Sequence, residues 1–314
     1  MSDPKYDDIL KDYWYYSMEL PDGRFTPGGN HPNVLTTREL LTRVEPVGAK
    51  VLDIGTMEAM VPILLSRRGA NVTAIDAGDF THKIEALKSA YGVDFDYHGR
   101  VSLPNTKTFL ADKTVFEGFL QPENPPRGYD MVVCSGVLYH VFSPLETLGL
   151  CRTMLRDGGI MIMETAASNL DEYSQRWNFD GNQWIYPNGT NTWFPTCRLL
   201  DHFMRLLRFR ILDCVYIPNY NDVVRVAVIA QAVPDLLATP AEVEWFQATT
   251  RNFDYDFFCD LEWAQGPAKP IKVTPGEVIK HADIDSVDMH RCVTELPGLH
   301  QDPERIKLRL SDQD

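Results

Sequence analysis

Residues 51–76 contain the pattern that most restricts the fold of this chain. An apolar run, Val51-Leu-Asp53-Ile-Gly55, ends in an acid with a glycine two residues later, and after a helix-like segment a second apolar run ends in Asp76. A buried strand, a turn, a helix and a second buried strand in this order predict two strands of one parallel sheet. Their carboxyl ends then meet at one edge, where an adenosine cofactor can bind.

The position of Asp53 discriminates between adenosine cofactors. A dinucleotide site offers glycines and a helix N-terminus to a pyrophosphate, which a carboxylate inside the turn would repel. Met57 and Ala59 stand where such a site would have its second and third glycines. S-adenosylmethionine has no phosphate, and its sulfonium and ammonium are attracted by an acid, while Asp76 can accept hydrogen bonds from both ribose hydroxyls. The pattern therefore favours S-adenosylmethionine; the alternative is two ordinary strand ends with acids in their turns.

The charge of the chain bears on its partners. The net charge is −14, whereas proteins that bind nucleic acid usually present a basic face. The densest basic stretch, with four arginines in residues 198–210, falls on an amphipathic segment. A small-molecule acceptor is favoured, and nucleic acid is disfavoured as a partner.

Cysteine usage and hydropathy predict a cytoplasmic protein without metal. The six cysteines are scattered and form no C-x-x-C pair, which indicates reduced core thiols and neither disulfides nor zinc ligands. The histidines show no metal-ligand spacing. No apolar run approaches the roughly 20 residues of a membrane helix, and the first residues lack the basic and apolar regions of a signal peptide.

Strand and helix patterns alternate regularly from residue 50, which predicts an α/β fold with helices on both faces of a parallel sheet. We expect strands at 50–54, 71–76, 93–97, 129–135 and 160–164, and helices at 59–68, 81–91, 106–120 and 144–156. A helix at 195–207 and a hairpin of strands near 209–217 and 223–231 would complete the sheet. Residues 33–45 are expected to form a helix, and residues 13–16 a short one.

The domain organisation is predicted in three parts. Residues 1–45 form an aromatic N-terminal segment, residues 46–231 the cofactor-binding domain, and residues 232–314 an acidic extension. The long aromatic loop at 168–194 breaks the alternation, and such loops are usually functional. The extension has 16 acidic and 8 basic side chains, and its aromatic residues 253, 255, 257 and 258 argue against disorder. We expect it to cover the site or to make a subunit contact.

The segment Tyr129-Asp-Met-Val-Val-Cys-Ser-Gly-Val-Leu-Tyr-His140-Val-Phe-Ser-Pro-Leu-Glu, followed by Ile162-Met-Glu-Thr165, resembles the class I S-adenosylmethionine-dependent methyltransferases. Within that class it is similar to the tRNA wobble-uridine carboxymethyltransferase family and its relatives, which Trp193-Phe-Pro195 also fits. The resemblance extends over about residues 10–230. It implies a Rossmann-like, seven-stranded, mostly parallel sheet with an antiparallel last strand.

The resemblance also implies site residues. Asp53, Gly55 and Asp76 match cofactor positions. Tyr139 and Arg225 fall where the tRNA family holds the extra carboxylate of carboxy-S-adenosylmethionine, whereas the family's lysine has no clear counterpart. The donor is therefore S-adenosylmethionine, with its carboxylated form not excluded.

Two residues are candidates for catalysis. His140 follows the fourth strand, where its usual pKa range suits a general base for a hydroxyl or amine acceptor; the alternative is that it caps the next helix or fills the strand end. Tyr139 is expected to orient the acceptor or contact the sulfonium, and packing explains it equally well.

The remaining candidates surround these residues. Glu58 is predicted to neutralise the ammonium of the cofactor, the alternative being a solvated acid in a first helical turn. The other cofactor candidates are Thr56, Ala77, Arg100, Val101 and Ser135. An apolar acceptor pocket would be walled by Tyr15, Tyr16, Trp177, Trp184, Tyr186 and Trp193, with Arg24 or Arg225 pairing an acceptor carboxylate. The alternative for each aromatic residue is a core or subunit contact.

These observations favour a methyltransferase that acts on a small molecule by in-line transfer to oxygen or nitrogen. One alternative is carboxymethyl or methyl transfer to a tRNA wobble uridine. Another is a non-catalytic binding module in which the missing glycines mark a degraded cofactor site. A nicotinamide oxidoreductase is disfavoured by the acid in the turn. The aromatic-rich ends are compatible with a homo-oligomer.

Overall fold

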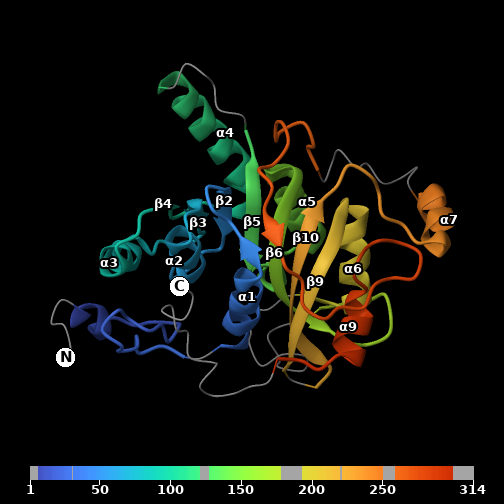
Figure 1. Cartoon of the computed structure of the whole chain (residues 1–314), viewed down its shortest axis with the longest axis horizontal. Helices are drawn as coiled ribbons and strands as arrows, with labels where there is room; N and C mark the ends of the chain where they lie inside the picture. Colours follow the sequence, from blue (N-terminus) through green and yellow to red (C-terminus); the bar gives the residue numbers. More distant parts are fainter. Residues whose placement is uncertain are drawn as a thin grey trace.

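A seven-stranded sheet forms the centre of the molecule, seen here in a computed structural model that describes residues 6–29, 31–120, 127–177, 193–219, 221–249 and 259–299 (Figure 1). The sheet order is β4-β3-β2-β5-β6-β10-β9. The neighbours from β4 to β6 are parallel, whereas β10 runs antiparallel to both β6 and β9. The predicted fold class is therefore confirmed, including the antiparallel last strand. The strands are β2 (Lys50–Ile54), β3 (Asn71–Ile75), β4 (Asp96–His98), β5 (Tyr129–Ser135), β6 (Leu155–Ser168), β9 (Phe209–Pro218) and β10 (Val223–Ala232).

Helices cover both faces of the sheet because its central strands are apolar on both sides. Leu52 and Val132 point into one core, whereas Val51, Met131 and Val133 point into the other. This arrangement is typical of a parallel sheet between two helical layers. One layer contains α1 (Pro32–Thr42), α2 (Met60–Arg67) and α3 (Thr81–Tyr91), and the other contains α4 (Leu103–Leu120), α5 (Pro144–Met154) and α6 (Cys197–Leu206).

Some predicted boundaries were wrong. The strand predicted at residues 93–97 is β4 at Asp96–His98. It starts later because Gly92, whose backbone is left-handed, ends α3, and residues 93–95 then form a loop. Strand β6 is longer than predicted, since its last residue Ser168 still pairs with Val223 of β10. The predicted helix at residues 13–16 is absent: a short 3₁₀ turn lies at Ile9–Lys11, and the amides of Tyr15 and Tyr16 donate to Glu58 outside any helix.

The predicted loop at 168–194 contains a short hairpin of β7 (Gln175–Trp177) and β8 (Trp193–Pro195). Trp184 and Tyr186, which lie between these strands, are outside the described residues, as are the aromatic residues at 253–258.

The described part of residues 232–299 packs onto the domain. Strand β11 (Lys272–Val273) pairs with β1 (Val44–Glu45), and α9 (Met289–Glu295) packs on α6, while α7 is Pro240–Thr249 (Figure 1). Cys259, Trp263 and Met289 belong to the same core as α5 and α6. These contacts make the extension continuous with the domain core. The three-part division of the chain stays a prediction.

All six cysteines are buried, which confirms that they belong to the core, and each is a thiol outside any disulfide. Within the ranges described, every helix is too short or too polar to traverse a bilayer.

Candidate active site

A cleft of about 960 Å³ opens at the carboxyl ends of β2, β3 and β5. Gly55 follows β2, Asp76 follows β3 and Gly136 follows β5, and all three line it. This is the edge where parallel α/β sheets bind their ligands. Most other lining side chains are apolar, among them Met57, Phe80, Val101, Leu103, Val137, Val141 and Leu150.

Gly55 is required by the geometry of the first turn. Its φ angle of +77° lies in the left-handed region, and a Cβ atom there would lie 2.3 Å from Cγ2 of Val137. Met57 and Ala59 also have positive φ angles, 48° and 60°, although a non-glycine residue there costs about 1–2 kcal/mol. The turn therefore keeps a glycine-like backbone without the glycines, which argues against the hypothesis of a degraded site.

Asp76 is oriented by two backbone amides. Its Oδ2 accepts a hydrogen bond from Met57 N at 2.8 Å, and its Oδ1 accepts one from Gly78 N at 2.7 Å. A carboxylate oxygen can accept a second hydrogen bond. The carboxylate therefore fits two ligand hydroxyls, such as those of a ribose.

Asp53 is only 2% exposed and is not among the residues that line the cleft. Burial raises its pKa to about 7; the Thr56 side chain opposes this shift, and the charge of Asp76 adds to it. Among the described residues, Asp53 Oδ2 and Thr56 Oγ1 have no hydrogen-bond partner. Orphaned buried oxygens are costly, and beside Gly55 they fit a ligand with an ammonium group.

Glu58 was predicted to bind the ammonium of the cofactor, but its carboxylate binds other groups of the chain. It is 1% exposed and is not part of the cleft wall. Its Oε1 accepts hydrogen bonds from Tyr15 N and from Nζ of Lys83, both at 2.8 Å, and its Oε2 accepts one from Tyr16 N at 2.9 Å. The alternative of a solvated acid is wrong as well.

Tyr139 and Arg225 meet in a buried cluster with Glu164, a residue that sequence reasoning missed. Arg225 Nε and Nη2 donate to the two oxygens of Glu164 at 2.8 Å each, and Nη2 also donates to Tyr139 Oη at 3.1 Å. The guanidinium lies 4.4 Å from the Tyr139 ring centroid. Burial raises the pKa of Glu164, against the opposing effect of Arg225. The sequence held one signal for this cluster: Glu164 and Arg225 each interrupt an apolar run that was expected to form a strand.

His140 faces the cleft at the end of a 3₁₀ turn (Leu138–His140). Its ring lies 4.2 Å from that of Tyr139. The interpretation of His140 as a helix cap is wrong, because the Ser143 side chain caps α5 by accepting from Glu146 N. Burial raises the pKa of Tyr139 to about 12. A phenol with this pKa stays protonated at neutral pH, so His140 is the better proton acceptor of the two.

An aromatic rim, defined as Phe142, Trp177 and Trp193, borders the cleft. Phe142 lines the cleft, is 77% exposed and packs edge-on against Trp177 at 5.4 Å between ring centroids. Trp177 in turn lies 4.4 Å from Trp193. The structure thus brings together two predicted aromatic residues and adds Phe142, which the sequence analysis did not include.

The other predicted residues divide into those that line the cleft and those that do not. Ala77 and Val101 line the cleft. Arg24 pairs with Asp7 and Asp22, and exposed Arg100 pairs with Asp79, so neither cation is presented to the cleft. Ser135 shares a hydrogen bond with Thr37. Tyr15 stacks on His31 with ring centroids 4.0 Å apart, and Tyr16 Oη accepts from Asn33 Nδ2.

One group of side chains has metal-ligand types: Asp201, His281 and Asp288. Arg205 Nε donates to Asp201 at 2.5 Å, and the Asp288 side chain caps α9. Asp201 also pairs with His281 at 3.1 Å and accepts a hydrogen bond from Met289 N at 3.0 Å, which joins α6 to the extension. The absence of a metal stays a prediction.

The sheet order, the acid-x-glycine turn and the second acid at the next strand end define the class I S-adenosylmethionine-dependent methyltransferase architecture. Residues 31–212 match the family model described as a methyltransferase domain. The chain therefore belongs to this family, and its resemblance to the class is confirmed. The narrower resemblance to the tRNA carboxymethyltransferases stays a prediction.

Curated relatives are named as ubiquinone biosynthesis O-methyltransferases. The one from Saccharophagus degradans is 29% identical over 48% of this chain and 58% of its own length, and the one from Marinobacter nauticus is 29% identical over 51% and 63%. The chain thus spans about three fifths of these relatives. The N-terminal domain of EvdMO1, solved in the presence of S-adenosylhomocysteine (SAH) and D-fucose, is 16% identical with a TM-score of 0.50 over 74% of this chain and 98% of that chain. This likeness shows the fold.

Proposed function

We propose that the protein is a cytoplasmic enzyme that transfers a methyl group from S-adenosylmethionine to a hydroxyl oxygen of a small, largely apolar acceptor. The observation that carries this proposal is the Asp76 carboxylate, which two backbone amides hold in the wall of the cleft beside Gly55. The buried oxygens of Asp53 and Thr56 support it, because they suit the ammonium end of the same molecule. Oxygen as the acceptor atom is supported by the names of the curated relatives.

The residues of the chain have distinct tasks in this mechanism. Gly55 and Asp76 would hold S-adenosylmethionine, which would supply an electrophilic methyl group. The acceptor oxygen would bond to that methyl carbon in line with the C–S bond, whose electron pair would leave with the sulfur. His140 takes the proton of the acceptor hydroxyl on a ring nitrogen. Tyr139 stays protonated and orients the acceptor, while its oxygen accepts a hydrogen bond from Arg225. The apolar walls and the aromatic rim exclude water.

The structure favours S-adenosylmethionine over its carboxylated form. Both oxygens of Glu164 bind the guanidinium of Arg225, which neutralises the cation that the resemblance assigned to an extra carboxylate. The net charge of −14 disfavours the tRNA alternative.

The test of the proposed function is calorimetry with SAH on the wild type and on Asp76→Asn. The variant loses the charge that strengthens hydrogen bonds to ribose, a difference of about 1.5–3 kcal/mol. We expect the affinity to fall about 10- to 150-fold. Asp79→Asn is the matched control, since Asp79 lies three residues away and does not line the cleft. Equal affinities of wild type and Asp76→Asn, or no binding to the wild type, would contradict the proposal.

A second prediction concerns His140. His140→Gln keeps the size of the side chain but cannot act as a base, so kcat for a hydroxyl acceptor is expected to fall at least about 100-fold. SAH affinity should change less than about threefold, because the cofactor residues are untouched. The measurement is SAH release with a panel of hydroxylated aromatic acceptors. His82→Gln, a histidine outside the cleft, is the control. An unchanged kcat in His140→Gln refutes the base role.

A further inference from the structure

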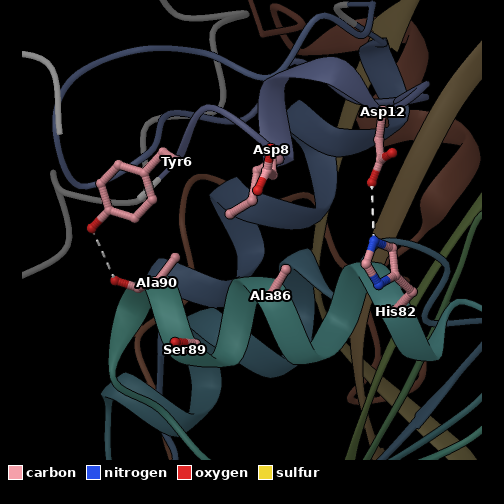
Figure 2. A pocket seen from close by; sticks show the side chains of 8 residues that line it. Tyr6, Asp8, Asp12, His82, Ala86, Ser89 and Ala90 are labelled. Atoms are coloured by element: carbon pink, nitrogen blue, oxygen red, sulfur yellow. Dashed lines mark hydrogen bonds and ion pairs between the residues drawn. The ribbon is translucent and has the colours of Figure 1, made fainter. Parts of the chain in front are cut away.

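The N-terminal segment, defined as residues 6–29, lies along α3, where Tyr6 and Ile9 are buried against the helix but two polar contacts to that helix are weak. Figure 2 shows Tyr6, Asp8 and Asp12 above the helix. They line a cavity of about 190 Å³ together with Ala86 and Ala90 of α3. Tyr6 Oη is 3.5 Å from the carbonyl oxygen of Ala90, and Asp12 pairs with the exposed His82 at 3.5 Å. Long hydrogen bonds and exposed ion pairs stabilise little.

Glu58 holds the same segment much more firmly. Its carboxylate binds the consecutive amides of Tyr15 and Tyr16 and pairs with Lys83 of α3. Lys83 Nζ also lies 4.8 Å from a Trp14 ring centroid. Charge-assisted hydrogen bonds in a buried place are the strong ones. One side chain thus joins the turn after β2, helix α3 and the N-terminal segment.

The direction of Glu58 depends on the cofactor turn. Its neighbour Met57 lines the cleft and donates its amide to Asp76. Met57 and Ala59, on both sides of Glu58, have left-handed backbones. A molecule that contacts Gly55, Met57 and Asp76 therefore fixes the backbone that aims the Glu58 carboxylate.

The segment that Glu58 holds lies behind the wall of the cleft and contributes no residue to its lining. Tyr16 is hydrogen-bonded to Asn33. A Cβ atom on Gly136, which lines the cleft, would lie 3.4 Å from Asn33 Nδ2 and 3.5 Å from Tyr139 Oη. Tyr15 and Tyr16 are therefore connected to the wall of the cleft next to Tyr139.

We infer that Glu58 is a positioning residue that couples cofactor binding to the placement of Tyr15 and Tyr16 behind the wall of the cleft, next to Tyr139. Cofactor in the cleft stabilises the turn, and Glu58 transmits this to the two amides. Coupling between two sites is reciprocal, so the factor by which cofactor favours the ordered segment equals the factor by which the ordered segment strengthens cofactor binding. Loss of the Glu58 contacts should therefore weaken cofactor binding by that factor. The inference rests on the proposed function for the identity of the cofactor.

The test is hydrogen exchange at the Tyr15 and Tyr16 amides of the full chain, without SAH and with SAH at saturation. In the wild type we expect SAH to slow exchange about tenfold, within the usual range of coupling between sites. Glu58→Gln should exchange about tenfold faster without SAH, bind SAH about tenfold more weakly and lose most of the slowing. Asp12→Asn, a control on the same segment, should behave like the wild type. Lys83→Met removes the ion pair with Glu58 together with the ammonium contact to the Trp14 ring, and it should lose part of the slowing.

The outcomes separate the two claims. No SAH binding to the wild type contradicts the proposed cofactor. SAH binding that leaves the exchange of both amides unchanged overturns the coupling, as does full SAH-dependent slowing in Glu58→Gln. If Glu58→Gln does not fold, unchanged slowing in Lys83→Met overturns it. A role in stability alone would lower the melting temperature of Glu58→Gln and leave the SAH-dependent slowing intact.

Discussion

Asp53→Asn is expected to raise the free energy of unfolding at pH 8 by as much as about 4 kcal/mol and to weaken cofactor binding. Burial raises the pKa of Asp53 to about 7 in the folded protein, against about 3.9 in an unfolded chain. Because the folded pKa is raised, the protonated form favours folding. The wild type therefore loses this stability as the pH rises from about 4 to about 7. Asparagine is neutral at every pH and avoids the loss, which is about 1.4 kcal/mol per pKa unit.

The measurement is urea unfolding at pH 5 and pH 8, together with SAH calorimetry at pH 8. The stability gain of Asp53→Asn should reach about 4 kcal/mol at pH 8 and only about 1.5 kcal/mol at pH 5. SAH binding should weaken because the ammonium has lost its buried carboxylate. Asp79→Asn is a control with the opposite pKa shift, since hydrogen bonds from Thr81 lower the pKa of Asp79. Loss of the Asp79 carboxylate should therefore not stabilise the protein. An equal change at both pH values in Asp53→Asn would show that the carboxyl is not the titrating group.

The edge of the sheet at which the cleft opens could be predicted from the sequence because its signals are local. Asp53, Gly55 and Asp76 stand at the ends of two apolar runs, and parallel pairing of those runs brings their ends to one edge. The adjacent pairing of β2 with β5 likewise brings Gly136 and His140 to the cleft.

The polar contacts between distant segments could not be predicted in this way. Glu164 and Arg225 are 61 positions apart, and they meet only because β10 inserts between β6 and β9. Glu58 is 43 residues from Tyr15, and nothing near it in the sequence identifies the two amides that it binds. Residues 13–16 look helical by themselves, but tertiary contacts place their amides on Glu58. Local propensity is a weak guide where such contacts exist.

Glu164→Ala is expected to lower the free energy of unfolding by about 3–5 kcal/mol. The pair with Arg225 is buried, with Glu164 0% and Arg225 3% exposed. Removal of one partner leaves an uncompensated charge in the core, which is strongly destabilising. Tyr139 Oη still accepts a hydrogen bond from Arg225 Nη2 at 3.1 Å in that variant, but a neutral phenol does not balance the charge of the guanidinium. Urea unfolding at pH 7 measures the effect.

The double variant Glu164→Leu/Arg225→Met distinguishes a buried charge from lost packing. Replacement of both charged groups by apolar groups removes the desolvation cost together with the attraction, so the double variant should be more stable than Glu164→Ala. Its kcat should nevertheless fall, since Tyr139 loses the guanidinium that holds its oxygen at 3.1 Å. Such a split between stability and activity would show that the pair is retained to orient Tyr139. A double variant less stable than Glu164→Ala would show instead that packing around the pair, not its charge, stabilises this part of the core.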